Sequence, residues 1–211
     1  IDALVCIGGD GSFRGAHQLV LEHQIQIVGI PGTIDNDIFG SDNTIGFDTA
    51  VNTALDAIDK IRDTAASHDR LFIVEVMGRN SGFIASHVGL AGGAEAVFTP
   101  DIPMTVENVL ERIKAGVSKG KTSSILITAR VQKPGRAYDL AEQIRKKSNF
   151  DAKVCILGHQ QRGGSPTAND RILASRLGAS AVQALLQKQT DIMLGVRGED
   201  IVSVSLEQAT K

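Results

Sequence analysis

Apolar runs and amphipathic stretches alternate along the chain with little interruption. The apolar runs predict strands at 1–7, 25–30, 71–76, 95–98, 123–128, 153–158, 191–196 and 200–205. Between most of them the periodicity is helical, at about 13–23, 48–66, 82–91, 105–117, 137–148 and 167–187. Continuous rather than alternating hydrophobicity indicates strands that are buried on both faces, as in a mainly parallel sheet covered by helices. The pattern therefore predicts an α/β, doubly wound fold.

Two of the helical stretches carry further signals. The one from 48 is long and amphipathic, with Val51, Leu55 and Ile58 on one stripe. Ser165 followed by Pro166 predicts the start of the helix at 167, because serine favours the cap position and proline the first turn.

Composition narrows the class of protein. Hydrophobic residues make up 42% of 211, enough for one large or two small cores. The net charge of −2 argues against nucleic acid or a membrane surface as a partner. Cys6 and Cys155 lie in apolar strand-like runs without metal-type spacing, which favours a reducing compartment and a cytoplasmic protein. The chain opens on a strand without an initiator Met, and we expect a fragment that lacks an amino-terminal part.

The segment Pro-Gly-Thr-Ile-Asp-Asn-Asp at 31–37 directly follows an apolar run. Its loop therefore leaves the carboxyl edge of a sheet, where open α/β folds bind ligands. Asp35 and Asp37 stand two apart, so in an extended segment both carboxylates face the same way. They repel each other unless a cation or a transferable proton separates them. The alternative is a solvated turn, because Pro, Gly, Asn and Asp all favour turns.

A second loop, Gly-Gly-Asp-Gly-Ser at 8–12, lies between a predicted strand and the helix expected from 13. Glycines at such a turn let backbone amides approach an anion, and the helix amino terminus adds partial positive charge. Asp10 repels phosphate unless it holds a bridging metal ion, and Mg²⁺ is the usual one. A glycine-rich turn alone is weak evidence, because tight strand-to-helix turns use glycine for steric reasons.

Basic side chains follow two later strands. Arg79 lies just after 71–76, where it can stabilise a phosphoryl group in transfer, although a single arginine more often forms a surface ion pair. His159 and Arg162 follow 153–158 and form a plausible phosphate cradle. Arg70, before a strand, is a weaker candidate.

Together these segments resemble a known family. The motifs at 8–12, 31–37, 76–79 and 158–166 occur in the order and spacing of the bacterial 6-phosphofructokinases. The resemblance implies ATP-dependent phosphorylation of fructose 6-phosphate to fructose 1,6-bisphosphate in glycolysis, with Mg²⁺. It also implies a homotetramer whose subunits have two Rossmann-like lobes. We expect 1–46 and 161–211 in the first lobe, on the ATP and Mg²⁺ side, and 47–160 in the second, on the sugar phosphate side.

The resemblance also assigns roles to single residues. Asp35 matches the base that takes the proton of the sugar's 1-hydroxyl, between Thr33 and Asp37, which flank the transferring phosphoryl group. The family's nucleotide-binding loop corresponds to Gly9, Asp10, Gly11 and Ser12 of this chain. Asp10 corresponds to the aspartate that binds Mg²⁺. The family's substrate-binding positions correspond to Ile34, Met77, Gly78, Arg79, His159, Gln160, Gln161 and Arg162. Arg70 and Lys153 match residues that reach a neighbouring subunit's sugar site, although the position of Lys153 is usually Arg.

An effector site is also implied by the resemblance. The positions that bind ADP or phosphoenolpyruvate between subunits match Arg62, Gly93, Glu95, Lys119 and Lys121. The alternative is that these residues are ordinary surface side chains, since charges on helix ends and turns are usually solvated.

The sequence leaves three alternative functions to compare with this one. Pyrophosphate-dependent relatives typically have Asp at position 11 and Lys at 32, where this chain has Gly11 and Gly32, which favours ATP. NAD and lipid kinases share the Gly-Gly-Asp-Gly turn but lack the other motifs. The third alternative is a non-catalytic, ligand-binding or regulatory paralogue, because Arg130 stands where the family usually has a Glu that hydrogen-bonds the sugar.

Overall fold

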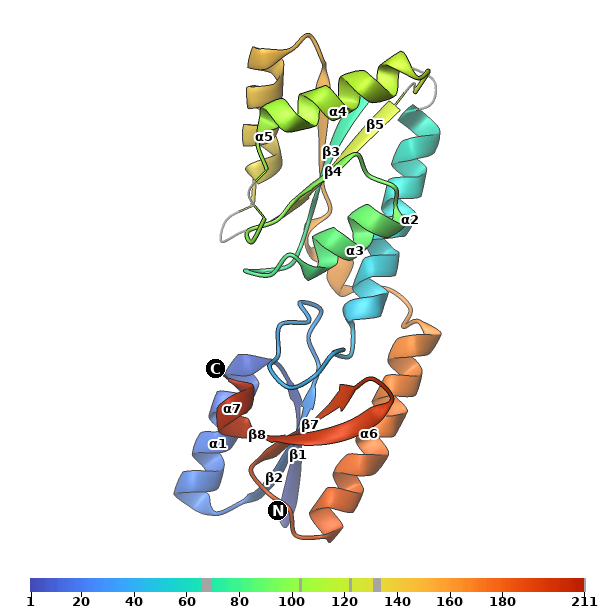
Figure 1. Ribbon diagram of the computed structural model, residues 1–211. Coiled ribbons are helices and arrows are strands. Elements are labelled where there is room, and N and C mark those ends of the chain that lie inside the picture. Colours follow the sequence, from blue (N-terminus) through green and yellow to red (C-terminus); the bar gives the residue numbers. More distant parts are fainter. Residues whose placement is uncertain (66–69, 103, 122, 131–133, 211) are drawn as a thin grey trace. The chain divides into compact units, whose positions relative to one another are not determined.

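The computed structural model describes residues 1–65, 70–102, 104–121, 123–130 and 134–210 (Figure 1). The chain forms two compact units, unit 1 with Ile1–Thr49 and Ser165–Lys211 and unit 2 with Ala50–Gly164. The boundaries expected from the sequence lay at 46/47 and 160/161. Each unit holds a sheet of four strands in the described residues. The predicted α/β architecture with mainly parallel sheets is confirmed.

Unit 1 has a sheet with the strand order β1-β2-β7-β8. Its strands are β1 (Ala3–Gly8), β2 (Gln26–Pro31), β7 (Ile192–Arg197) and β8 (Asp200–Ser205). Its helices are α1 (Asp10–His23), α6 (Ala168–Leu186) and the short α7 (Leu206–Ala209). Among the strand pairs described for this sheet, β7–β8 is antiparallel and the others are parallel.

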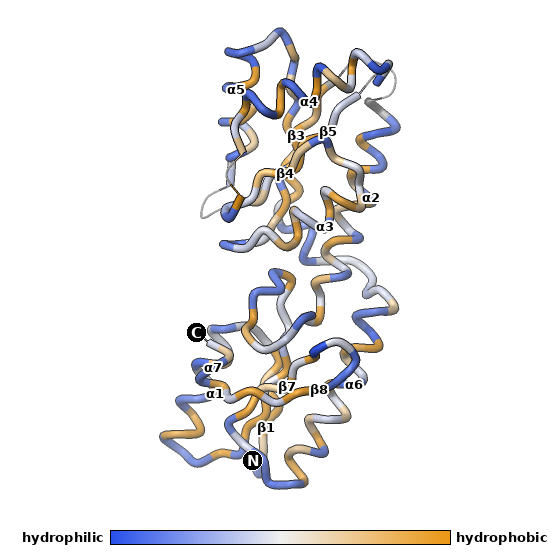
Figure 2. Tube along the Cα trace, viewed as in Figure 1, coloured by the Kyte–Doolittle hydropathy of each residue, from blue (hydrophilic) through white to orange (hydrophobic). Residues whose placement is uncertain are grey.

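Both faces of this sheet are covered, as the continuous apolar runs predicted. Ile27 and Met193 lie in one cluster with Phe13 of α1. The next residues along the strands, Val28 and Leu194, belong to a second cluster with Leu177 of α6. This two-residue alternation sends successive side chains into separate cores. In Figure 2 the strands are accordingly among the most apolar parts of the trace.

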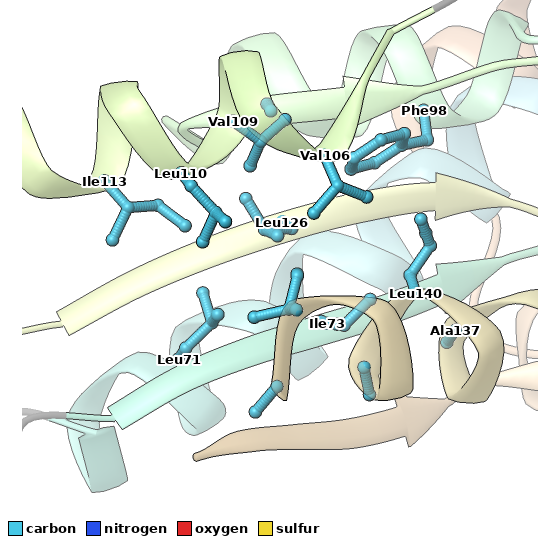
Figure 3. Packing of buried hydrophobic residues seen from close by; sticks show 14 residues of the cluster. Leu71, Ile73, Phe98, Val106, Val109, Leu110, Ile113, Leu126, Ala137 and Leu140 are labelled. Atoms are coloured by element: carbon cyan, nitrogen blue, oxygen red, sulfur yellow. The ribbon is translucent and has the colours of Figure 1, made fainter. Parts of the chain in front are cut away.

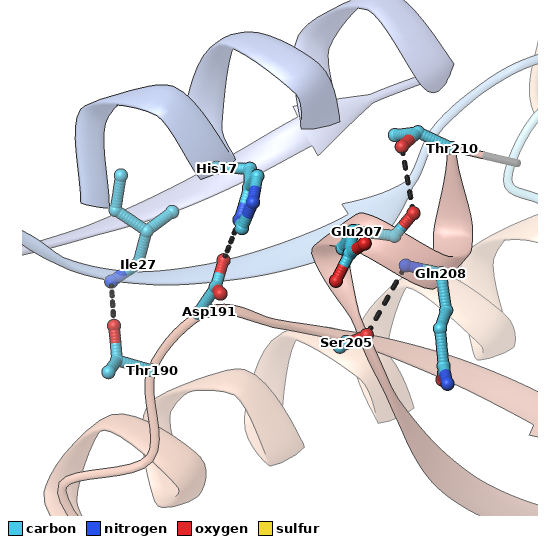
Figure 4. A network of polar contacts seen from close by, with 8 residues as sticks. All are labelled: His17, Ile27, Thr190, Asp191, Ser205, Glu207, Gln208 and Thr210. Carbon is cyan, nitrogen blue, oxygen red and sulfur yellow. Dashed lines mark hydrogen bonds and ion pairs between the residues drawn. The ribbon is translucent and has the colours of Figure 1, made fainter. Parts of the chain in front are cut away.

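Polar contacts join the late part of the chain to α1 and β2 (Figure 4). Nδ1 of His17 lies 2.7 Å from Oδ1 of Asp191, just before β7. The backbone N–H of Ile27 donates to Oγ1 of Thr190 at 3.0 Å. Ser205 caps α7 by accepting the Gln208 N–H at 3.2 Å. These contacts fix the entry and exit of the β7–β8 hairpin.

Unit 2 has a fully parallel sheet with the order β4-β5-β3-β6. Its strands are β3 (Arg70–Val76), β4 (Ala96–Phe98), β5 (Ser123–Ala129) and β6 (Ala152–Ile156). Its helices are α3 (Phe83–Ala91), α4 (Val106–Ser118), α5 (Arg136–Lys147), the 3₁₀ helix η1 (Gly158–Arg162) and most of α2 (Phe47–Ala65), which begins in unit 1. On one face, Leu71, Ile73 and Leu126 pack against α4 and α5 (Figure 3).

Three local predictions were wrong. The first helix begins at Asp10 rather than 13, because the glycine turn itself winds into the helix. The strand expected to 158 ends at Ile156, and 158–162 form η1. The helix expected at 167 begins at Ala168, and its cap is Thr167, which accepts the Asp170 N–H at 3.3 Å. A threonine oxygen caps as Ser165 was expected to.

In the part of the chain that the structure describes, no helix combines the length and apolarity needed to cross a membrane.

Candidate active site

Two of the predicted motifs are neighbours in unit 1. β1 and β2 are parallel, with Gly8 opposite Pro31, so both motifs leave the same edge of the sheet. The N–H of Gly32 donates to the carbonyl of Gly8 at 2.9 Å. A Cβ added at Gly9 would lie 3.7 Å from the Cβ of Thr33. The glycine turn and the loop with the two aspartates are therefore in contact.

The glycine turn opens helix α1. The N–H of Phe13 donates to the carbonyl of Gly9 at 3.0 Å, and no side chain caps this helix at Gly9. The first amides of α1 thus point toward the turn, where they favour an anion. A Cβ at Gly8 would clash with the side chain of Ser12, whereas one at Gly11 would meet nothing within 4 Å. Gly8 is required by packing, while Gly11 leaves open space.

Asp10 is the carboxylate of this turn. It is the first residue of α1, where a negative charge suits the helix dipole, and its Oδ2 lies 3.9 Å from Nη2 of Arg14. Within the described residues no group of three or more His, Cys, Asp or Glu side chains is arranged to hold a metal by itself. A single carboxylate does fit Mg²⁺ that takes its other ligands from phosphate oxygens and water.

The Asp35–Asp37 loop is not extended, so the condition under which both carboxylates were expected to face the same way is not met. Asn36 between them has φ 53, in the left-handed region, which breaks the alternation of a strand. Asp37 is exposed, whereas Asp35 is half-buried and its Oδ1 is shielded from solvent. The Asp35 N–H donates to Oγ1 of Thr33 at 3.3 Å. The two aspartates therefore have different surroundings.

Two residues that support this loop were missed by the sequence analysis. Thr44 is buried, and its hydroxyl donates to the carbonyl of Thr33 at 2.6 Å. Asp170 is buried and accepts the N–H groups of Gly46 and Thr49, each at 2.9 Å. The Thr-x-x-Asp pattern at 167–170 is a helix-start signal that points to Asp170 as a first-turn residue. No sequence signal points to Thr44.

In unit 2 the predicted basic residues leave neighbouring strands. Arg130 follows β5, Arg79 follows β3, and His159 and Arg162 lie in η1 after β6. The sheet order β5-β3-β6 brings these strand ends together. Arg130 N–H extends the ladder by donating to the carbonyl of Val76 at 2.8 Å. Three strand ends thus supply four cationic or titratable side chains to one edge, which suits a phosphate group.

The turn that carries Arg79 has an unusual backbone. Gly78 has φ 151 and Arg79 has φ 50. A Cβ at Gly78 would lie 2.8 Å from the carbonyl oxygen of Ser81, whose N–H and hydroxyl both donate to the Gly78 carbonyl, at 2.8 and 3.0 Å. A non-glycine residue in the left-handed region costs free energy and is often found at functional sites.

Gln161 and Gln160 are adjacent but differently placed. Gln160 is exposed, whereas the Gln161 side chain is buried. The N–H of Met77 donates to Oε1 of Gln161 at 2.7 Å, and Nε2 of Gln161 donates to the carbonyl of Ala50 at 3.4 Å. In this structure the Gln161 amide therefore fixes Met77 against η1. Ile34, the other substrate position, is half-buried in unit 1.

Lys153 and Arg70 are not brought together with the four basic residues. Both lie near the amino ends of their strands, at the other edge of the sheet. Lys153 forms an ion pair with Asp151 at 2.6 Å. The side chain of Arg70 lies outside the described residues.

The residues matched to an effector site form two contacts in unit 2. Arg62 donates to the carbonyl of Gly92, beside Gly93, which has φ 61. Lys121 pairs with Glu95, whose other oxygen accepts the N–H of Ile125. Lys119 is exposed at the end of α4.

The two cysteines are free thiols and are half-buried. Desolvation by burial raises the pKa of both Cys6 and Cys155. Both therefore stay protonated at neutral pH, as expected of cysteines that serve as small hydrophobic side chains.

Comparison with known proteins gives consistent matches. The Phosphofructokinase family matches residues 1–185. The chain is 59% identical over 200 residues to "ATP-dependent 6-phosphofructokinase 1" of Thermus thermophilus, which covers 94% of this chain and 62% of that protein. It is 52% identical over 212 residues to "ATP-dependent 6-phosphofructokinase 2" of Bacteroides thetaiotaomicron, which covers 100% and 65%. The chain thus spans 62–65% of the length of these two relatives.

Solved structures of phosphofructokinases superimpose closely on this chain. The phosphofructokinase of Saccharomyces cerevisiae superimposes with a TM-score of 0.89 at 33% identity, over 99% of this chain and 32% of that one. A pyrophosphate-dependent phosphofructokinase of Marinobacter aquaeolei gives a TM-score of 0.81 at 26% identity, over 99% and 60%.

Proposed function

The chain belongs to the phosphofructokinase family, and on this premise we propose that the protein carrying it transfers the γ-phosphoryl group of ATP to the 1-hydroxyl of fructose 6-phosphate. The product is fructose 1,6-bisphosphate. One observation carries the proposal: the glycine turn contacts the loop of Asp35, with Gly32 N–H 2.9 Å from the Gly8 carbonyl. A phosphate-binding turn beside a carboxylate is the pairing that phosphoryl transfer to an alcohol requires.

In unit 1, Asp35 is the proposed general base. An alcohol proton is held too tightly to leave unaided at neutral pH, so a base within hydrogen-bond reach is needed. Thr33 and Asp37 flank the transferring group. The amides at Gly9, Gly11 and Ser12 bind nucleotide phosphates. Asp10 is the ligand for Mg²⁺, which when bound neutralises phosphate charge.

In unit 2, Arg79 is proposed to stabilise the charge of the phosphoryl group in transfer. His159 and Arg162 are proposed ligands of the 6-phosphate, and Met77 and Gly78 line the sugar. The contact of Gln161 with Met77 supports a role in holding that lining. Ile34 and Gln160 complete the proposed substrate contacts.

Further properties are proposed by the same resemblance. The protein acts in glycolysis in the cytoplasm as a homotetramer, in which Arg70 and Lys153 reach a neighbouring subunit's sugar site. The effector proposal, ADP or phosphoenolpyruvate, involves Arg62, Gly93, Glu95, Lys119 and Lys121. The contacts of Arg62 and Lys121 with their own subunit support a preformed arrangement there.

The phosphoryl donor is tested at Gly11. Gly11→Asp adds a carboxylate to the nucleotide turn, where like charge and bulk oppose the ATP phosphates. We expect the KM for ATP to rise about tenfold while the KM for fructose 6-phosphate stays within about twofold, measured by steady-state kinetics.

The matched control is Gly15→Asp. It places the same side chain on the same helix where a new Cβ also meets nothing within 4 Å. Gly32→Lys is a poorer test, because a Cβ there would lie 2.9 Å from Cγ2 of Ile7 and disturb packing. An unchanged KM for ATP in Gly11→Asp would show that this glycine does not line the nucleotide site.

The proposed function itself is tested by turnover of the complete protein with fructose 6-phosphate and Mg²⁺, with ATP or pyrophosphate as donor. We expect fructose 1,6-bisphosphate with ATP and little with pyrophosphate. Turnover only with pyrophosphate would reverse the donor assignment. Binding of fructose 6-phosphate without turnover would favour a non-catalytic paralogue, the alternative that Arg130 motivates.

A further inference from the structure

A buried hydroxyl lies directly behind the loop that carries Asp35. Thr44 is 1% exposed, and its Oγ1 donates to the carbonyl of Thr33 at 2.6 Å. The same oxygen lies 3.1 Å from Oδ1 of Asn36. Both contacts go to residues that flank Asp35. A position needed only for packing would be served as well by valine, which has the same shape without a hydroxyl to satisfy.

The loop needs such support because of its backbone. Asn36 has φ 53, a conformation that costs free energy and persists when the surroundings hold it. Its Nδ2 donates to the carbonyl of Asp42 at 3.0 Å, and its Oδ1 lies near Oγ1 of Thr44, whose single proton is shared between this oxygen and the Thr33 carbonyl. The direction of the Asp35 side chain follows from the backbone on either side of it.

The segment that carries Thr44 is itself anchored. The N–H of Ile45 donates to the carbonyl of Pro31 at 2.9 Å, at the end of β2. The N–H groups of Gly46 and Thr49 donate to the buried carboxylate of Asp170 on α6, each at 2.9 Å. Thr44 therefore links the aspartate loop to a strand end and a long helix.

We propose that Thr44 is a positioning residue for the general base, acting through the Thr33 carbonyl and the Asn36 side chain. The inference rests on the proposed function of Asp35. Removing the hydroxyl leaves the Thr33 carbonyl without its buried donor and releases the left-handed turn. A base displaced by a fraction of an ångström loses rate, while substrate contacts made elsewhere are kept.

The test compares Thr44→Val with Thr44→Ser in the complete protein. Valine removes the hydroxyl and keeps the shape, whereas serine keeps the hydroxyl and removes a methyl group. We expect Thr44→Val to lower kcat about tenfold with both KM values within about twofold of wild type. Thr44→Ser should stay within about threefold of the wild-type kcat.

A second readout does not depend on turnover. The N–H of Asp35 donates to Oγ1 of Thr33, and its hydrogen exchange reports how firmly the loop is held. We expect exchange about tenfold faster in Thr44→Val and unchanged in Thr44→Ser.

The outcomes separate the two proposals. If the wild type turns over and Thr44→Val has the same kcat, the positioning role of Thr44 is overturned and the proposed function stands. Equal losses of kcat in both variants point to packing and also overturn it. If the wild type does not turn over, the proposed function fails, and the exchange rates alone decide whether Thr44 holds the loop.

Discussion

Asp35→Ser in the complete protein is expected to lower kcat by at least about 100-fold, the usual scale of a lost general base. Affinity for fructose 6-phosphate should be nearly unchanged, because the proposed phosphate ligands His159 and Arg162 are retained. Steady-state kinetics gives kcat, and calorimetric titration of the sugar phosphate gives the affinity. The half-buried setting of Asp35 beside Thr33 is the structural reason for choosing it over the exposed Asp37.

The matched control is Asp56→Ser, which removes a carboxylate from an exposed face of α2, where Asp56 pairs with Lys60. Exposed pairs of this kind contribute little, so kcat should stay within about twofold of wild type. A loss of less than tenfold in Asp35→Ser would mean that another group takes the proton.

Arg130→Glu is expected to tighten binding of fructose 6-phosphate about 30-fold, with little change in ATP affinity. Arg130 is half-buried at the end of β5, next to the turn of Met77 and Gly78. A guanidinium there offers donors but no acceptor to a sugar hydroxyl. A charge-assisted hydrogen bond to a carboxylate is worth about 1.5–3 kcal/mol, and each 1.4 kcal/mol is about tenfold in affinity.

Arg130→Met separates the two ways in which Arg130 can weaken binding. Methionine removes the positive charge and part of the bulk, and its thioether is only a weak hydrogen-bond acceptor. If obstruction is the cause, Met should recover much of the gain; if the missing acceptor is the cause, only Glu should. Titration of the three proteins with fructose 6-phosphate, side by side, decides between the two causes. Weaker binding in both variants would show that Arg130 contributes to holding the 6-phosphate with His159 and Arg162.

The sheets could be predicted closely because their signal is long and redundant. Every predicted strand and long helix is present, since continuous apolar runs leave few alternatives to a buried parallel strand. The errors are at the ends of elements. The end of β6 was misplaced because the apolar residues continue to Leu157, while Gly158, with φ 56, turns the chain into η1. A backbone conformation set by one glycine does not appear in hydrophobic periodicity.

The sequence predicts which residues make up the candidate site, but not which residues support them. Short motifs with few possible uses point to Asp10, Asp35, Arg79 and His159 as candidates, and their roles stay predictions. The expected orientation of Asp35 and Asp37 assumed an extended backbone, and that assumption was wrong because Asn36 is left-handed. No sequence signal points to Thr44, and the helix-start pattern at 167–170 points to Asp170 but not to its partners, the N–H groups of Gly46 and Thr49 more than 100 residues earlier in the chain. Only the fold reveals such pairs.

The order of the chain in the two units has a consequence for synthesis on the ribosome. Unit 2 is one continuous stretch, so all four of its strands have been made before β7 emerges. Unit 1 cannot be completed then, because β7 lies between β2 and β8, and Asp170 belongs to the late α6. Domains tend to fold as units during translation. The nascent chain therefore carries the Asp35 loop, made early, before the α6 carboxylate is present to anchor the neighbouring segment of Thr44 at Gly46 and Thr49. The proposed base is then fixed in place late.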